Sequence, residues 1–255
     1  VNEDESINTL AQATSEIYLD PSSGIDTNTG LTSDTAIKTF DKAKALSSSG
    51  GTIYLCNTLT LSTNDETIDG EDKNLTLKRY GSSFTGAMIE ATATGMNIKN
   101  LTMDGGAVWT GDLDETLGRG TTNSGIQAKN SVVYIRGGDT TLTNCVLQNN
   151  DSTSRASGAK VYNRSTFKMI GGKVLSNTSG ISGGGIGYED GAQSGGNIEL
   201  YGVTIGSKNA GNQARDGGGG IFLYQSSGSG PLNKVVIEDT DINYNKAKDG
   251  GGVYV

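Results

Sequence analysis

One glycine-rich phrase returns three times in the last third of the chain, and it limits what the chain can fold into. It reads Gly183-Gly184-Gly185-Ile186, then Gly217-Gly218-Gly219-Gly220-Ile221, then Gly250-Gly251-Gly252-Val253. The apolar residues that close the phrases are 35 positions (186 to 221) and 32 positions (221 to 253) apart. Repeats of this length are typical of one supersecondary unit stacked on copies of itself. The sequence therefore predicts a solenoid.

A second phrase lies between these glycine runs: an apolar residue, another one five positions later, and then an asparagine. It reads Met169…Val174…Asn177, Leu200…Ile205…Asn209 and Ile237…Ile242…Asn245. Asn150, Asn177 and Asn245 each come three residues after an apolar residue. We expect such asparagines to stack as a ladder, with each amide bonded to the next rung.

The type of solenoid follows from what each unit contains. Short β-type apolar runs alternate with Gly, Ser, Asn and Asp, without the i, i+3, i+4 spacing of helical repeats. A propeller blade needs four strands, and these units have room for two or three. The pattern predicts an all-β parallel β-helix of about six or seven rungs. The 39 Gly and 2 Pro residues suit a coil with many corners.

Domain organisation follows from the same pattern. Residues 1–15 are acidic and polar and are expected to be a flexible lead-in, and 16–255 form one β-helix domain. Ser33-Asp34 can begin an amphipathic capping helix over 35–47, with one apolar face. Such a helix would cover the open end of the coil. The acidic start and the strand-like end at Val253-Tyr254-Val255 suggest a mature fragment whose natural chain continues.

One interval is longer than the others. Ile98 and Leu142 are 44 positions apart, whereas the next unit needs only 27. The excess lies at 107–124, which we expect to project as a loop. It carries the only tryptophan, Trp109, close to Asp112 and Asp114. Projecting loops often carry function, so these three residues are candidates for ligand binding. The alternative is a variable insertion with a partly packed tryptophan.

The opening of the chain carries a family resemblance. Its residues are Tyr18-Leu19-Asp20-Pro21, Gly24, Asp26, Gly30, Thr39-Phe40, Lys42-Ala43 and Gly50-Gly51-Thr52-Ile53-Tyr54-Leu55. This segment resembles the entry of pectate-lyase-like right-handed β-helix proteins. The resemblance implies a right-handed, single-stranded coil. It does not imply an activity, because lyases and non-catalytic surface proteins both begin this way.

From about Leu142 onward the chain resembles the repeats of polymorphic outer-membrane proteins and related bacterial surface β-helices. Their signatures are Gly-Gly-Ala-(Ile/Leu/Val) and Phe-x-x-Asn. Here glycine replaces alanine in the first, and aliphatic residues replace phenylalanine in the second, as in Leu147-x-x-Asn150 and Val174-x-x-Asn177. The resemblance implies display at the cell surface and adhesion.

Several chemistries are excluded by composition. With 0 His, the nucleophile systems that depend on histidine and histidine-ligated zinc are absent. The formal net charge of −8 argues against nucleic acid as a partner. No apolar run approaches the ~18 residues of a membrane span, so direct insertion of this segment is not expected. Cys56 and Cys145 are interpreted as two small buried thiols, with a bridge between them as the alternative.

Calcium is the one metal that the carboxylates could hold, and no other cofactor is expected. Asp216 and Asp249 precede successive glycine runs, so they could occupy equivalent corners of neighbouring rungs about 4.8 Å apart. The alternative is that both are solvated corner residues beside Arg215 and Lys248.

These observations favour a non-catalytic bacterial protein of the adhesin or passenger type, extracellular or at the cell surface. Its expected partner is a carbohydrate or a host surface protein. A Ca²⁺-dependent polysaccharide lyase on the same coil is the main alternative, because carboxylates with a Lys or Arg base suffice for that reaction. A structural spacer is the third. Fold alone does not choose among them.

Overall fold

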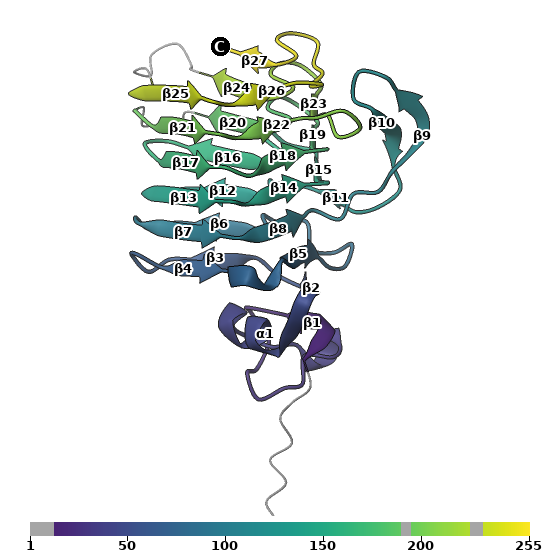
Figure 1. Ribbon diagram of the computed structural model, residues 1–255, viewed down its shortest axis with the longest axis vertical. Helices are drawn as coiled ribbons and strands as arrows, with labels where there is room; N and C mark the ends of the chain where they lie inside the picture. Colours follow the sequence, from purple (N-terminus) through teal and green to yellow (C-terminus); the bar gives the residue numbers. More distant parts are fainter. Residues whose placement is uncertain (1–12, 190–194, 225–231) are drawn as a thin grey trace, which may run out of the picture.

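The computed structural model in Figure 1 describes residues 13–189, 195–224 and 232–255. The regular secondary structure of the described chain is almost entirely β-strand, arranged mainly as parallel sheets whose strands stack along the long axis. It has one α-helix, α1 (Phe40–Leu46), and two short 3-10 helices, η1 (Ser33–Thr35) and η2 (Glu71–Lys73).

Four parallel sheets run along the stack. Sheet A contains β1 (Thr14–Leu19), β2 (Ser47–Leu55), β5 (Leu75–Arg79), β8 (Leu101–Asp104), β14 (Val146–Gln148), β18 (Lys173–Leu175), β22 (Thr204–Ile205) and β26 (Asp241–Ile242). Sheet B contains β3 (Leu59–Leu61), β6 (Ile89–Ala91), β12 (Val133–Ile135), β16 (Ala159–Tyr162), β20 (Ile186–Glu189), β24 (Ile221–Tyr224) and β27 (Val253–Tyr254). Sheet C contains β4 (Thr67–Asp69), β7 (Met96–Lys99), β13 (Asp139–Thr143), β17 (Thr166–Ile170), β21 (Asn197–Tyr201) and β25 (Lys234–Glu238). Sheet D has only two-residue strands, β11 (Gln127–Ala128), β15 (Asp151–Ser152), β19 (Thr178–Ser179) and β23 (Gln213–Ala214).

The chain visits these sheets in a fixed cycle. It passes from sheet A to B to C and back to A, and on the four rungs that contain β11, β15, β19 and β23 it adds a strand of sheet D between A and B. Within the described residues the cycle runs six times, and β26 and β27 begin a seventh. This path is compatible with a parallel β-helix and agrees with the six or seven rungs expected.

The columns expected from the repeats are confirmed. Ile186, Ile221 and Val253 are successive partners in sheet B. Met169, Leu200 and Ile237 are successive partners in sheet C, and sheet A pairs Val174, Ile205 and Ile242 in the same way. Each member below the last rung is fully buried, and such a side chain stabilises the fold by roughly 1.5–3 kcal/mol.

The glycine runs are required where sheet D approaches sheet B. Gly183, Gly218 and Gly250 all have positive φ, at +74°, +65° and +56°. A Cβ on the following Gly184 would lie 2.4 Å from the carbonyl oxygen of Gly219 on the next rung. The first group of glycines is therefore needed for the left-handed backbone, and Gly184 is needed because a side chain there would clash with the next rung.

The asparagine ladder is present, with one correction. Asn150, Asn177 and Asn245 belong to it, but its third member is Asn212 and not Asn209. The backbone N–H of each lower asparagine donates to the Oδ1 of the next, at 3.0–3.2 Å. Four extra residues between Ile205 and Asn212 displace the ladder from the expected spacing.

The N-terminal cap is shorter than expected. The predicted helix over 35–47 is wrong at its start, because the Ile37 N–H donates to the Tyr18 carbonyl and its own carbonyl accepts from Asp20, both at 2.8 Å. The helix begins only after Thr39, whose side chain accepts from the Lys42 N–H. Of the lead-in, residues 1–12 lie outside the described part, and Thr14 and Ser15 already belong to β1.

Both cysteines are free thiols. Cys145 is buried as expected, whereas Cys56 is only partly buried. Burial raises the pKa of each thiol to about 11, so neither is a reactive thiolate at neutral pH. No helix among the described residues is long and apolar enough to cross a membrane.

Candidate functional site

The insertion at 107–124 forms an antiparallel hairpin and not an irregular loop. Its strands are β9 (Trp109–Asp114) and β10 (Arg119–Asn123), with Trp109 opposite Asn123 and Asp114 opposite Arg119. Figure 1 shows the hairpin leaving the stack beside β11 and rising along its side. We call residues 109–123 the strap.

The strap is fastened to one column of outward-facing residues. Asp151, Thr178 and Gln213 are successive partners in sheet D, and Gln213 is bridged to Lys246 on the next rung. The Asn123 amide donates to the Asp151 carboxylate at 3.0 Å, and Arg119 donates to the Thr178 hydroxyl at 2.6 Å. At the far end Asp114 forms an ion pair with Lys246. The strap therefore spans the rungs from β15 to the last one.

The turn of the strap docks on the four-residue insertion that displaced the asparagine ladder. The Leu117 carbonyl accepts from the Gly211 N–H at 2.9 Å, and Arg119 Nε donates to the Gly211 carbonyl at 3.0 Å. Leu117 is fully buried, and Gly118 packs directly against Asn209. The strap turn and the insertion before Asn212 both interrupt the repeat and lie about 90 residues apart in sequence, yet they contact each other.

The side chains of Trp109, at the base of the strap, and Arg119, near its turn, contact each other. The Arg119 guanidinium carbon lies 3.7 Å from the centre of the Trp109 ring, a cation–π contact. The indole Nε1 donates to the Ser176 carbonyl at 3.0 Å, which fixes the orientation of the ring. Burial lowers the pKa of Arg119 to about 10, so the side chain keeps its charge at neutral pH.

A groove of about 350 Å³ lies between the strap and sheet D. It is lined by Trp109, Thr121, Asn123, Asp151, Thr178, Ser179, Gly180, Gln213 and Arg215. One aromatic ring thus faces carboxylate, amide, hydroxyl and guanidinium groups. This combination suits a polyhydroxylated ligand, because planar polar groups can pair with hydroxyls while a ring packs on C–H surfaces. We call it the strap groove.

The three residues expected to bind a ligand have different positions. Trp109 lines the strap groove, whereas Asp112 is exposed on β9 and Asp114 anchors the strap. The hydrogen bond from Lys246 holds the pKa of the Asp114 carboxyl below its ordinary value. The ligand role of these residues stays a prediction, and the geometry favours Trp109.

The two aspartates considered for calcium are stacked on neighbouring rungs, since the Asp249 N–H donates to the Asp216 carbonyl at 2.9 Å. The Asp216 carboxylate, however, is held by Arg215 through two bonds of 3.0 and 2.9 Å. That pairing lowers the pKa of Asp216. In the described part of the chain, no three Asp, Glu, Cys or His side chains are grouped as a metal site would require.

The polar column under the strap was not anticipated, yet the sequence contains a signal for it. Asp151, Thr178, Gln213 and Lys246 each directly follow a ladder asparagine. Because successive side chains of a strand alternate between faces, the residue after each buried amide points outward. Arg215 joins the groove from the end of β23, two residues after Gln213.

No protein-family model, no curated protein and no solved structure matches this chain. The resemblances to pectate-lyase-like and polymorphic outer-membrane proteins therefore stay predictions from its residues.

Proposed function

We propose that this chain is a non-catalytic carbohydrate-binding module of a bacterial protein, displayed at the cell surface or secreted in the manner of an adhesin passenger. Its scaffold is a right-handed, single-stranded parallel β-helix of the pectate-lyase-like kind. The cyclic path through parallel sheets supports this scaffold, since crossovers between parallel strands are right-handed in about 98% of cases.

The strap groove is the observation that carries the proposal. Trp109 is oriented by the Ser176 carbonyl and backed by Arg119, so its ring is held rigid before a ligand arrives. Gln213 and Thr178 present polar groups at the rung spacing opposite that ring. A rigid aromatic beside regularly spaced polar groups is suited to binding sugar rings.

Binding is tested with a glycan array, followed by calorimetry on the best ligand. Gln213 lies in the groove without fastening the strap, so Gln213→Ala should weaken binding about fivefold while the thermal midpoint holds. Trp109→Ala should weaken it more, by about tenfold. Thr141→Ala, on the outer face of sheet C, is the control and should bind as the parent does. Absence of any glycan ligand, or an unchanged affinity in Gln213→Ala, would refute the proposal.

The lyase alternative has one observation in its favour. Asp151 and Arg215 place a carboxylate and a guanidinium in one groove, although the pairing of Arg215 with Asp216 raises the Arg215 pKa and weakens it as a base. The discriminating experiment is incubation with polygalacturonate and other uronate polymers plus Ca²⁺. Growth of the unsaturated-product absorbance would favour the lyase, and binding without turnover favours the module. A spacer would give neither.

A further inference from the structure

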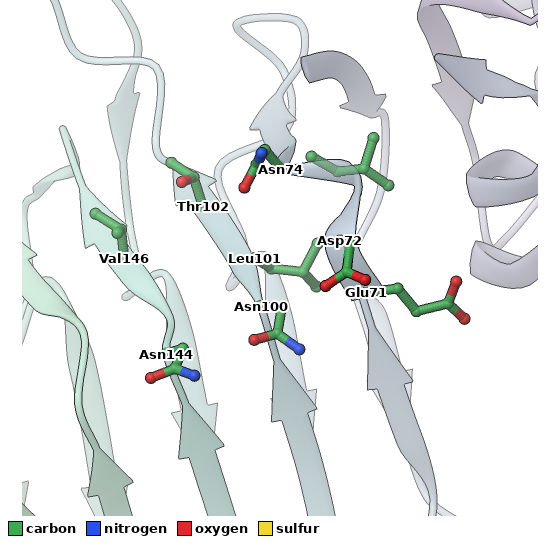
Figure 2. Close-up of a pocket in the computed structure, with 9 residues that line it drawn as sticks. Glu71, Asp72, Asn74, Asn100, Leu101, Thr102, Asn144 and Val146 are labelled. Atoms are coloured by element: carbon green, nitrogen blue, oxygen red, sulfur yellow. The ribbon is translucent and has the colours of Figure 1, made fainter. Parts of the chain in front are cut away.

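A second groove lies at the N-terminal ends of the sheet A strands, at the corner where the chain passes from sheet C to sheet A. Figure 2 shows its lining residues on successive rungs. The groove has a volume of about 530 Å³, and the buried side chains of Leu75 and Leu101 form its floor. Thr102 and Val146 complete the wall on the outer face of sheet A. We call it the corner groove.

Three asparagines occupy the same corner on successive rungs. Two of them, Asn74 and Asn100, directly precede the partnered strands β5 and β8, and Asn144 lies two residues before β14. All three have φ of +53°. This left-handed conformation is open to asparagine and glycine and costs most other residues energy. The backbone therefore favours glycine, asparagine or aspartate here and does not by itself select asparagine.

The upper rungs show the other choice. At the same corner position Gly171 and Gly202 have φ of +64°, and Asp239 has φ of +48°. Glycine occupies two of these three corners and aspartate the third, so the turn does not require an amide where the corner groove is absent. The amides of Asn74, Asn100 and Asn144 coincide with the groove, which gives the three side chains a use beyond the turn.

The amides retain hydrogen-bonding capacity toward the groove. Asn100 Nδ2 donates to the Asp69 carboxylate at 2.9 Å, which orients the amide and leaves its oxygen available. In Figure 2 the Asn100 and Asn144 amides lie at the same corner of neighbouring rungs, Asn74 lies apart from them near Thr102, and Asp72 lies beside Leu101. Strand spacing puts Asn100 and Asn144 about 4.8 Å apart. The Asn100 and Asn144 amides beside the partly exposed Thr102 and Val146 side chains suit the hydroxyls and C–H faces of a sugar chain.

Charge narrows the class of sugar. Glu71 is neutralised by Lys44 at 2.8 Å, and Asp69 lies opposite Lys99. Asp72, by contrast, belongs to none of the ion pairs among the described residues. A carboxylate at the edge of the groove repels uronate polymers and attracts an ammonium group.

We propose that the corner groove is a second carbohydrate site, which takes a linear chain without acidic groups and prefers amino sugars. The Asn100 and Asn144 amides bind hydroxyls, and Asp72 pairs with the ammonium. This site shares the scaffold with the strap groove but none of its residues, so either site can fail while the other stands.

The test is calorimetric titration of the 255-residue chain with three probes: chitosan, cello- and galacturonate oligosaccharides. Asn144→Gly and Asn100→Gly keep the left-handed turn and should each weaken chitosan- and cello-oligosaccharide binding about fivefold. Asp72→Asn should weaken only chitosan binding, by about the same factor. Asp239→Gly changes the same corner position outside the groove, and it is the matched control.

The outcomes separate the two sites. Binding of the chitosan probe that survives Gln213→Ala and falls in Asn144→Gly supports the corner groove. Loss of binding in Gln213→Ala alone assigns the probe to the strap groove and overturns the corner site. Failure of both the chitosan and the cello probe to bind, or equal binding of the galacturonate probe, also overturns it. Circular dichroism melts of each glycine variant confirm that the fold is intact.

Discussion

A single buried amide on each upper rung ties the inside of the stack together. Asn212 is fully buried, and its Nδ2 donates to the Val174 carbonyl at 2.8 Å and to Asn245 Oδ1 at 2.9 Å. Its Oδ1 accepts from the backbone N–H of Asn177 at 3.0 Å. Asn177 and Asn212 therefore each bond the rung below and the rung above.

The ladder predicts a sharp difference between two nearby asparagines. Asn212→Ala should lower the free energy of unfolding by about 2–4 kcal/mol, because it leaves a buried N–H and a buried carbonyl without partners. Asn209→Gly retains the positive φ of +71° and should change it by less than about 0.5 kcal/mol. Urea denaturation of both variants measures this. Equal losses would mean that the ladder does not pass through Asn212.

Below the ladder a buried arginine links neighbouring rungs through its hydrogen bonds. Arg79 is 1% exposed and donates to the carbonyls of Phe84, Gly86 and Gly105 and to Asn150 Oδ1. Burial lowers the pKa of this guanidinium to about 10, so it is still charged at neutral pH. Its charge is satisfied by neutral oxygens on three sides and by the Phe84 ring, 4.7 Å away.

Lysine cannot replace this arginine. Arg79→Lys should lower the free energy of unfolding by about 1–3 kcal/mol, since an ammonium group cannot reach four acceptors that are spread around a planar fork. Arg136→Lys is the matched control, because Arg136 is exposed, with Glu90 as its ion-pair partner and the Tyr134 ring 5.8 Å from its guanidinium. That change should stay within about 0.5 kcal/mol. Guanidinium denaturation compares the two, and a similar loss in both would contradict the role given to Arg79.

At the scale of elements, the sequence predicts the strands that repeat and does not predict the elements that occur only once. The columns through Ile186 and Val174 follow from fixed intervals between apolar residues. The strap does not, because Trp109–Asp114 has no apolar alternation and its ion pair joins residues 132 positions apart. The strands of sheet D are two residues long, too short for any period to appear.

The candidate site was located only in part for the same reason. Trp109 stands out in the sequence as a rare residue in an insertion, whereas its partners Thr178 and Gln213 are ordinary polar residues of regular rungs.

The start of the N-terminal helix is not predictable in the same way, because Ser33-Asp34 looks like a cap while Ile37 pairs with the strand β1. Long-range backbone pairing overrode the local signal there.

The strap should loosen in acid. Its pairing with Lys246 lowers the Asp114 pKa below the ordinary 3.8, so the stabilisation is complete above about pH 4 and is lost as pH falls through the folded-state pKa. The protection factors of the 109–123 amides, which compare their exchange with that of the unfolded chain at the same pH, should fall below that pH. In Asp114→Asn the 109–123 amides should exchange two- to fivefold faster at neutral pH, from about 0.5–1 kcal/mol for an ion pair whose lysine is about half exposed. The variant should also lose the acid dependence.

The control for the strap is a second carboxylate in the same strand. Asp112 is exposed, and Asp112→Asn should leave both the neutral exchange rate and the acid transition unchanged. If Asp112→Asn and Asp114→Asn behave alike, net charge and not the Lys246 contact governs the strap.

At the scale of the whole molecule, stability comes from contacts between neighbouring rungs, and the strap is the exception that joins several of them. The middle rung is one complete unit: Leu142 pairs with Met169, Leu147 with Val174, and Ala159 with Ile186, all 27 positions apart. A solenoid with this uniform offset should accept removal of a whole unit.

Deletion of 146–172 should therefore fold. Cys145 would then be followed by Lys173, whose register partner Val146 is among the residues removed, so β18 takes the place of β14. The free energy of unfolding should fall by ~3 kcal/mol, at about 0.1 kcal/mol per residue removed. The strap would lie one rung out of step and lose its Lys246 anchor, so its amides should exchange rapidly while those of the sheets stay protected.

Deletion of 146–171, one residue shorter, turns every inward side chain of the following strand outward and should not fold. Circular dichroism and hydrogen exchange on the two deletions decide the matter: a folded shorter deletion, or an unfolded complete one, would show that the rungs do not behave as stacked, interchangeable units.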